Sequence, residues 1–374
     1  MPAQVLHILH GLRVLEDLKH QGPPSLRVLA ESLQEATFFP SFCLGCQGPD
    51  IFYHNQRTRP VGLEYGSLMH RRGYGSVTAV LLGEAIQESQ HWEVPRQELA
   101  YSVGFAMHPF LDRALHPYII SRSGSGGNAA ETVAHALYHI FLERLLDAAF
   151  LEVSRDEPWM RAFLPWLGLV DPGQPAVYGF RQKEMLAEPA CALAGALVPL
   201  LVRALTTAYP ERAGRDKLLE QRLAHVFTDA AYFYEHTDPV TAGNRINATA
   251  RGGIDASHAR YLAAILYPIQ VQGDVDVLNS RRDEWLHPCE GTGASHASVH
   301  QLFDEAVDAA KATLLQAWEA NEQGEIATAI GTASLSTNDA EGRRCQPRHF
   351  SPLPLERLLN DQVMARWGDL NVQP

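Results

Sequence analysis

The chain has 374 residues, of which 46% are hydrophobic and 20% are charged. This composition is that of a folded globular protein and excludes disordered, collagen-like, coiled-coil and disulfide-scaffold chains. A net charge of −12 opposes charge-driven binding to nucleic-acid polymers or anionic lipid, while 17 His beside only 31 Lys and Arg direct attention to metal sites.

Helical spacing of apolar residues dominates the chain, and strand-like alternation is scarce. The first predicted helix covers residues 5–20, with an apolar stripe that begins at Val5 and Leu9. Further helices are expected at 74–90, 97–107, 131–151, 185–206, 217–235 and 298–320. Ser298, with Gln301 three residues later, forms a capping box that marks the start of the last helix. The stretches 236–255 and 270–297 are expected to be loops.

These elements predict an all-α fold: a compact multi-helix bundle with long connecting loops and a metal cluster between helices. We expect a metal-binding helical core over residues 1–205, and C-terminal helices packed on that core over residues 206–330. The polar, Pro-containing stretch 331–374 is expected to be an extended tail. Long loops in a compact domain are usually functional, so the loops are candidate sites as well.

Neither the cysteines nor the N-terminal segment suggests secretion. Five Cys are too few and too uneven for a disulfide framework, and the lone C-x-x-C of Cys43 and Cys46 lacks the second pair that a zinc ribbon needs. The N-terminal segment resembles no secretory signal, and the longest uncharged apolar run, 189–202, is shorter than the about 20 residues that span a membrane. We therefore expect a soluble cytoplasmic protein that meets any lipid only peripherally.

A polar stripe runs along the predicted helix at 131–151. His135, His139, Glu143 and Asp147 recur every four residues and so share one helix face. Apolar residues flank the stripe on both sides, so we expect it to be buried, where ionisable groups must be paired or bind a cation. The stripe is therefore either part of a metal site or a His–Glu pair beside a core histidine.

A second polar cluster follows the predicted helix at 97–107. His108, Asp112 and His116 are again spaced by four, and imidazole and carboxylate are the ligands of zinc and its neighbours. Pro109 and Pro117 each follow a His and disfavour helical geometry in the residue before them. We expect His108 and His116 to lie at kinks or helix ends that aim their rings at a common point. A purely structural role is the alternative.

Three single residues upstream complete the candidate set. Asp50 follows the turn-forming pair Gly48-Pro49, His70 lies in the phrase GSLMHR, and His7 is close to the N-terminus. Each is a weak signal by itself, because most lone histidines are not metal ligands. Their order relative to the two clusters makes them informative.

Taken together, these residues resemble the zinc-dependent phospholipase C family, whose fold group also includes single-strand nucleases. The family's ligand types run His, Asp, His, His-x3-Asp, His and His-x3-Glu. The matching residues here are His7, Asp50, His70, His108, Asp112, His116, His139 and Glu143. The phrases MPA…H…G, GPDI, GF…H…D…HPYI and H…E…D are also similar, and all of them lie within residues 1–150.

The resemblance implies two or three zinc ions in one cleft. One zinc would be held by Asp50, His70, His108 and Asp112; a second by His116, His139 and Glu143; and a third by His7 with Asp112 bridging. In the secreted relatives the third ion also uses the amino group of a processed N-terminal aromatic residue, whereas this chain begins Met1-Pro2. His10 is an alternative to His7, and His135 is an alternative to His139. Other divalent transition metals suit the same ligand types.

The implied activity is hydrolysis of a phosphodiester by metal-activated water, with a phospholipid head group as substrate. Asp50 would be both a ligand and the general base. Asp147 and His135 are candidates to orient ligand imidazoles, as carboxylates and other acceptors commonly do; for Asp147 the alternative is an exposed surface residue. Arg122, in the Gly-rich stretch 121–128, is either a phosphate contact or part of a plain connector.

Two other functions stay open at the level of sequence. One is a metal-dependent phosphodiesterase or nuclease that acts on small nucleotides, since the negative charge of the chain disfavours polymers. The other is a non-catalytic helical protein that binds metals for stability or binds a partner. The sequence does not specify the head group, the metal or the oligomeric state.

Overall fold

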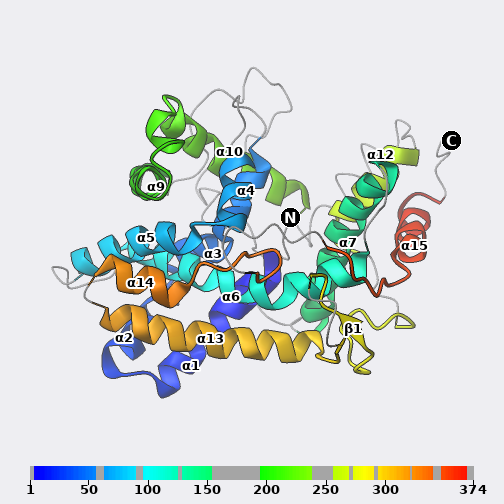
Figure 1. Cartoon of the computed structure of the whole chain (residues 1–374), viewed down its shortest axis with the longest axis horizontal. Coiled ribbons are helices and arrows are strands. Elements are labelled where there is room, and N and C mark those ends of the chain that lie inside the picture. The colour runs from blue at the N-terminus through cyan, green and yellow to red at the C-terminus, as the bar shows by residue number, and fades with distance from the viewer. Residues whose placement is uncertain are drawn as a thin grey trace.

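The computed structural model describes residues 4–55, 63–89, 96–124, 129–153, 194–237, 256–268, 273–289, 294–320, 322–339 and 347–368. Within these ranges the fold is all-α, as predicted. The only β structure among them is a short antiparallel hairpin of β1 (Trp285–Leu286) and β2 (Ala294–Ser295). Figure 1 shows helices stacked in several directions around one central helix, α6 (Gln97–Ser123).

Helix α6 lies at the centre of the fold and carries three of the candidate ligands. It packs against α1 (Gln4–Gln21), α3 (Phe39–Cys46), α5 (Tyr74–Ser89), α7 (Ala129–Val153) and α13 (Val299–Glu319). Nearly all of its residues are buried, which explains why its apolar residues follow no single stripe. A polar residue on this helix must therefore find its partners inside the protein.

Two prolines lie inside α6, so the predicted end of the helix near residue 107 is wrong, and His108 and His116 lie within a continuous helix. Pro109 has no N–H for the carbonyl oxygen of Phe105, four residues earlier. The hydroxyl of Tyr74 on α5 donates to that oxygen at 2.5 Å instead. A tertiary hydrogen bond thus replaces the missing helical one and allows the helix to continue.

Helices α3 and α6 approach each other closely because glycine lies at their contact. A Cβ on Gly45 would lie 2.1 Å from the carbonyl oxygen of Tyr101, and a Cβ on Gly104 would lie 2.3 Å from that of Phe42. No other residue type fits at either position without moving the backbone. The chain that leaves α3, η1 (Gly48–His54), therefore begins directly beside α6.

The remaining helices cover this centre from three sides (Figure 1). Helix α14 (Gln323–Ile330) packs on α5, and α9 (Ala194–Ala208) lies between α5 and α10 (Leu219–Thr237). Helix α12 (Ala256–Ile265) packs on α7 and on α15 (Leu355–Trp367). The other described elements are α2 (Pro24–Ser32), α4 (Leu63–Arg71) and η4 (Ala213–Arg215). Residues 185–193 of one predicted helix and most of the predicted loop 236–255 lie outside the described residues.

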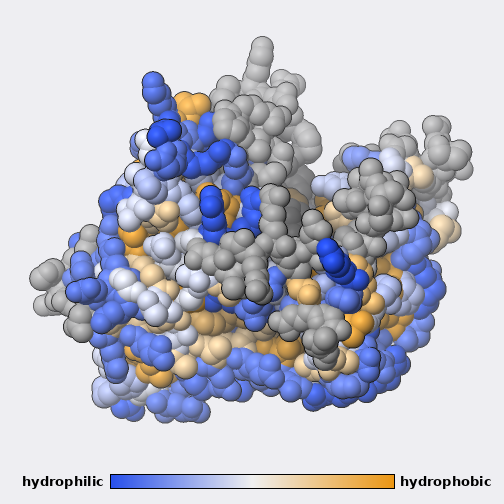
Figure 2. All heavy atoms as spheres, in the orientation of Figure 1, coloured by the Kyte–Doolittle hydropathy of each residue, from blue (hydrophilic) through white to orange (hydrophobic). Residues whose placement is uncertain are grey.

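Helix α13 has the amphipathic pattern that the sequence predicts. Its apolar stripe, Leu302, Ala306, Ala310, Leu314 and Ala317, is buried against α1 and α6. At its start the Ser298 hydroxyl accepts a hydrogen bond from the Gln301 backbone N–H at 3.2 Å, as the capping motif predicts. Figure 2 shows hydrophilic side chains along the edge of the molecule that α13 and α1 form.

Most of the buried apolar residues that the structure describes form one large cluster that extends from Val5 to Trp367. The stretch 331–374, predicted to be an extended tail, contains helix α15, and this part of the prediction is wrong. Leu355, Leu358 and Leu359 have helical spacing and are buried, so a short amphipathic signal was present within the polar stretch. The division of the chain near residue 205 stays a prediction.

Candidate metal centre

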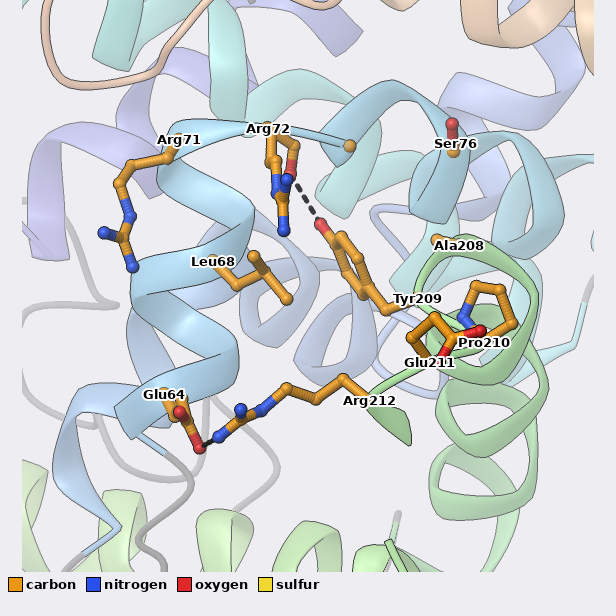
Figure 3. A pocket seen from close by; sticks show the side chains of 11 residues that line it. Glu64, Leu68, Arg71, Arg72, Ser76, Ala208, Tyr209, Pro210, Glu211 and Arg212 are labelled. Carbon is orange, nitrogen blue, oxygen red and sulfur yellow. Dashed lines mark hydrogen bonds and ion pairs between the residues drawn. The ribbon is translucent and has the colours of Figure 1, made fainter. Parts of the chain in front are cut away.

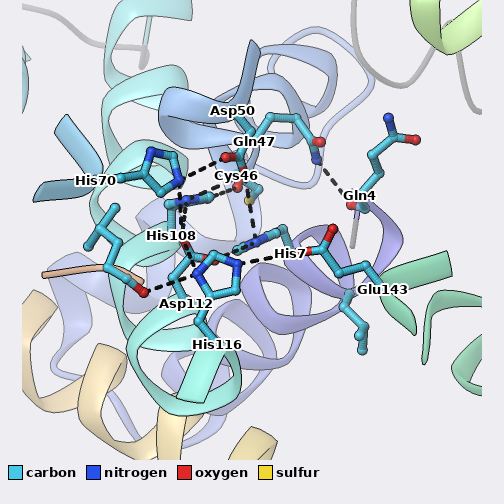
Figure 4. Close-up of polar contacts among 12 residues, drawn as sticks. Gln4, His7, Cys46, Gln47, Asp50, His70, His108, Asp112, His116 and Glu143 are labelled. Carbon is cyan, nitrogen blue, oxygen red and sulfur yellow. Dashed lines mark hydrogen bonds and ion pairs between the residues drawn. The ribbon is translucent and has the colours of Figure 1, made fainter. Parts of the chain in front are cut away.

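Five elements bring the eight candidate ligands together. His7 lies on α1, Asp50 on η1 and His70 on α4; His108, Asp112 and His116 lie on α6, and His139 and Glu143 on α7. Figure 4 labels all of these ligands except His139, and their side chains converge from separate elements on the middle of α6. Residues that are far apart in the sequence thus form one polar cluster in the interior of the protein.

The first ligand group is built around the carboxylate of Asp112. Its Oδ1 lies 3.2 Å from Nε2 of His7, and its Oδ2 lies 3.0 Å from Nε2 of His108 and 3.5 Å from Nε2 of His70. The carboxylate of Asp50 lies opposite, with Oδ1 3.0 Å from Nε2 of His70 and Oδ2 3.5 Å from Nε2 of His108. The rings of His7 and His108 are stacked, with centroids 4.1 Å apart.

The second ligand group adjoins the first. Oε1 of Glu143 lies 3.1 Å from Nε2 of His139 and 3.4 Å from Nε2 of His116. The other ring nitrogen of His116, Nδ1, lies 3.9 Å from Oδ2 of Asp112. His116 and Asp112 therefore connect the two groups, and the whole arrangement can hold more than one ion.

Backbone carbonyls fix the orientation of three of the imidazoles. Nδ1 of His70 is 2.8 Å from the carbonyl oxygen of Gly66, Nδ1 of His108 is 3.1 Å from that of Cys46, and Nδ1 of His116 is 3.1 Å from that of Leu335. A carbonyl oxygen only accepts, so each of these Nδ1 atoms carries the proton. The Nε2 atoms then point their lone pairs at carboxylate oxygens, which requires a second proton or a cation between them.

Burial and the neighbouring carboxylates shift the pKa values of the ligand histidines in opposite directions. Burial opposes charge on His116, but the negative charges of Asp112 and Glu143 outweigh it and raise the pKa of His116 to about 9. Burial is likewise outweighed at His108, whose pKa is raised by Asp112 and Asp50. Burial dominates at His7 and His139, where it lowers the pKa of the imidazole. Without metal, a proton on His116 balances part of the buried negative charge at neutral pH.

The donor set fits divalent metal ions. His7, Asp50, His108 and Asp112 each offer a ligand atom, and these atoms lie within 4.8 Å of one another; the same is true of His116, His139 and Glu143. Oδ2 of Asp50 is buried and makes no hydrogen bond within the described part of the chain. Imidazole and carboxylate from several rigid elements are the ligands of zinc and related metals. Two buried groups that can bind metal ions are therefore present.

The structure also decides between two neighbouring histidines on α1. His7 joins the first ligand group, whereas His10 is fully buried and lies edge-on to Phe303 with ring centroids 5.8 Å apart. Burial lowers the pKa of His10 to about 3, so it is a neutral core residue. His7 does not form a separate set with Asp112 alone but shares its group with Asp50 and His108. The side chain of His135, the alternative to His139, lies outside the described residues.

Asp147 and Arg122 make different contacts from those that the sequence suggested. Asp147 accepts hydrogen bonds from the backbone N–H of Leu6 at 2.9 Å and from the hydroxyl of Tyr267 at 2.9 Å, and so contacts the start of α1 rather than a ligand ring. The guanidinium of Arg122 donates to the carbonyl oxygens of Ser351 and Asp283 and to the side chain of Asn279. Arg122 thus ties the C-terminal segment to the residues before β1.

A buried polar network around the start of α1 had no counterpart in the sequence analysis. Arg144 donates to the side chain of Gln4 at 2.9 Å and to the hydroxyl of Tyr267 at 3.0 Å, and the Gln47 amide donates to the Gln4 carbonyl oxygen at 3.1 Å. Together with Asp147, these contacts hold the turn of α1 that carries His7. They join residues up to 263 positions apart in the sequence, so no local motif announces them.

Comparison of the chain with protein-family models, with curated proteins and with solved structures found no match. Among the described helices, none combines the length and the apolar character that crossing a membrane requires. Cys43 and Cys46 are free and buried, whereas Cys289 is disulfide-bonded.

Proposed function

We propose that this chain is a metal-dependent phosphodiester hydrolase similar to the zinc-dependent phospholipases C, with two or three zinc ions as its cofactor. The observation that carries the proposal is the connection of two buried ligand groups through Asp112 and His116. Adjacent cation sites are a recurrent arrangement in enzymes that cleave phosphodiesters. The order of the ligand types along the chain supports the same family.

When bound, divalent ions supply Lewis acidity, which polarises phosphoryl oxygens and lowers the pKa of water. We assign the general base to Asp50, because its Oδ1 faces His70 at 3.0 Å while its buried Oδ2 makes no hydrogen bond with a described residue. In this mechanism Oδ2 accepts a proton from the water that attacks phosphorus. The oxygen–phosphorus bond on the opposite side breaks, and the alcohol leaves with a proton from solvent.

Substrate would approach from the side of the second ligand group. The His139 side chain is 21% exposed and the His116 side chain 10%, whereas those of His7, His70 and His108 are 5% exposed or less. A phospholipid head group is the substrate that the resemblance favours. The alternatives are a small nucleotide phosphodiester, because the net charge of −12 opposes long polyanions, or no catalysis at all.

The decisive experiment starts with the metal content of protein purified without a metal-affinity tag, measured by plasma mass spectrometry. The loaded protein is then assayed with short-chain phosphatidylcholine and with a dinucleotide, each with and without a chelator. Chelator-sensitive release of phosphocholine supports the phospholipase C assignment. Turnover of the dinucleotide alone favours the nucleotide phosphodiesterase. Bound metal that raises thermal stability without any turnover favours the non-catalytic protein.

A pair of aspartate variants makes this test specific. Asp112→Asn keeps the shape of the side chain but removes the charge shared by both ligand groups, so metal content and turnover should fall together. Asp304→Asn on the exposed face of α13 is the matched control and should leave both unchanged. Full metal content in the Asp112→Asn protein would refute the assignment of the site.

A further inference from the structure

A cationic groove lies at the end of α4 that follows His70. One cavity of about 520 Å³ lies between α4, the start of α5 and the chain after α9, and a second of about 580 Å³ adjoins it. The two cavities share Glu64, Arg72, Glu211 and Arg212, so they form one continuous groove. None of its lining residues is a candidate metal ligand. Volumes of this size are typical of small-molecule sites.

The groove carries an excess of positive charge on a strongly negative protein. Its cationic residues are Arg71, Arg72, Arg212, Arg215, Lys217 and Arg222, and its acidic residues are Glu64, Glu211 and Asp216. Each acidic side chain pairs with one arginine: Glu64 with Arg212, Glu211 with Arg215, and Asp216 with Arg222. Three cations therefore remain without a carboxylate partner among the described residues, although the chain has a net charge of −12.

Arg72 is the cation best placed to meet a ligand. Its backbone is held by the Tyr209 hydroxyl, which donates to the Arg72 carbonyl oxygen at 2.6 Å. Figure 3 shows its guanidinium extending into the cavity between Leu68 and the ring of Tyr209. No described residue makes an ion pair or hydrogen bond with this guanidinium. By contrast, Nε of the neighbouring Arg71 donates to the Ser67 carbonyl oxygen at 2.8 Å.

We infer that this groove binds a soluble phosphomonoester, with the phosphate on Arg72 and an apolar or aromatic organic group against Leu68, Tyr209 and Pro210. A guanidinium fork matches the oxygens of a phosphate, and the excess of three positive charges suits a dianion better than a carboxylate. The apolar wall beside Arg72 provides a surface for the organic group. This inference goes beyond the proposed hydrolase activity and does not depend on it.

The test is calorimetric titration of phenyl phosphate, which combines a phosphate dianion with an aromatic ring. The metal centre also attracts phosphates, so the titration uses the wild-type protein and Asp112→Asn, in which the groove is intact. The groove site should persist in Asp112→Asn and weaken at least about ten-fold in Arg72→Ala, because one charge-assisted contact is lost. Arg27→Ala removes another exposed arginine, on α2, and should bind as the wild type does.

A second variant changes affinity in the opposite direction. Glu64→Gln releases Arg212 from its ion pair and removes a negative charge, so phenyl phosphate should bind several-fold more tightly. Loss of binding in Asp112→Asn with retention in Arg72→Ala would overturn the inference, because the metal centre would then be the only site. Equal weakening by Arg27→Ala, equal affinity for benzoate, or Arg72-dependent binding only to vesicles containing phosphatidate would overturn it as well.

Discussion

Gly48 lies against the ring of His108 so closely that a Cβ on Gly48 would be 2.4 Å from Cγ of the imidazole. Gly48 also has a φ of +54°, a conformation that other residues adopt only with strain. It starts η1, which carries Asp50. One glycine thus allows two ligands from different elements to face each other.

Gly48→Ala should therefore damage the first ligand group. The positive φ alone costs about 1–3 kcal/mol for a residue with a side chain, and the contact with His108 adds to it. We expect a lower melting temperature and loss of metal from the first group, measured by calorimetry and by metal analysis. Gly195→Ala on α9 is the control, because a Cβ there meets nothing within 4 Å. Wild-type metal content in Gly48→Ala would show that the His108 ring need not occupy its observed position.

The two ligand groups should respond differently to single substitutions. His139 belongs only to the second group, whereas Asp112 faces His7, His70 and His108 in the first group and His116 in the second. His139→Ala should lose the ion of the second group and keep the metal of the first. Asp112→Asn should lose metal from both. Metal analysis after equilibrium dialysis gives the number of ions bound per chain. Loss of all metal from His139→Ala would contradict the presence of two separable groups.

Metal binding should release protons at neutral pH. The pKa of His116 is raised to about 9, so its ring holds an extra proton at pH 7 in the metal-free protein, and the raised pKa of His108 favours an extra proton on that ring too. A ligand imidazole must be neutral, so the metal displaces these protons. For each displaced proton, affinity should fall up to about ten-fold per pH unit below the raised pKa.

The same shifts predict an opposite trend for the stability of the metal-free protein. A folded-state pKa above the unfolded value gives stability that is complete below pH 6.5 and is lost as the pH rises through about 9. Titration with zinc in buffers of different ionisation enthalpy measures the number of released protons. Thermal unfolding of the metal-free protein, prepared with a chelator, at several pH values between 6 and 9 measures the loss of stability. Zinc binding without proton release at pH 7 would refute the raised pKa values.

Much of the candidate site could be predicted from the sequence, because several of its ligands are close neighbours along the chain. Ligands four residues apart on one helix, such as His108 and Asp112, share a face whatever the rest of the chain does. Their apolar flanks indicate burial. The ordered series of ligand types then selected His7, and the structure brings His7 rather than His10 to the same group.

The parts that sequence analysis missed depend on contacts between distant residues. No sequence feature near Pro109 indicates that Tyr74 donates the hydrogen bond that the proline cannot make. Asp147 belongs to the predicted stripe, but its hydrogen bond to the backbone of Leu6 connects residues 141 positions apart. The groove around Arg72 combines α4 with the chain after α9, so its excess charge appears only after folding.

The hydroxyl of Tyr74 should contribute measurably to the free energy of unfolding. Tyr74→Phe keeps the ring that stacks on Phe105, with centroids 4.9 Å apart, and removes only the donor to the Phe105 carbonyl oxygen. The buried carbonyl would then lack a partner, at a cost of about 1–3 kcal/mol. Denaturant unfolding of the metal-loaded protein measures this cost, and Tyr261→Phe at a 49% exposed position should change nothing measurable.

A second substitution tests the cause of that cost. Pro109→Ala restores an N–H at the position from which a regular helix would bond to the Phe105 carbonyl. In the Tyr74→Phe background this N–H can replace the lost hydroxyl, so the double variant should recover much of the stability. A double-mutant cycle with no coupling between the two positions would show that the hydroxyl and the proline act independently, contrary to the structure.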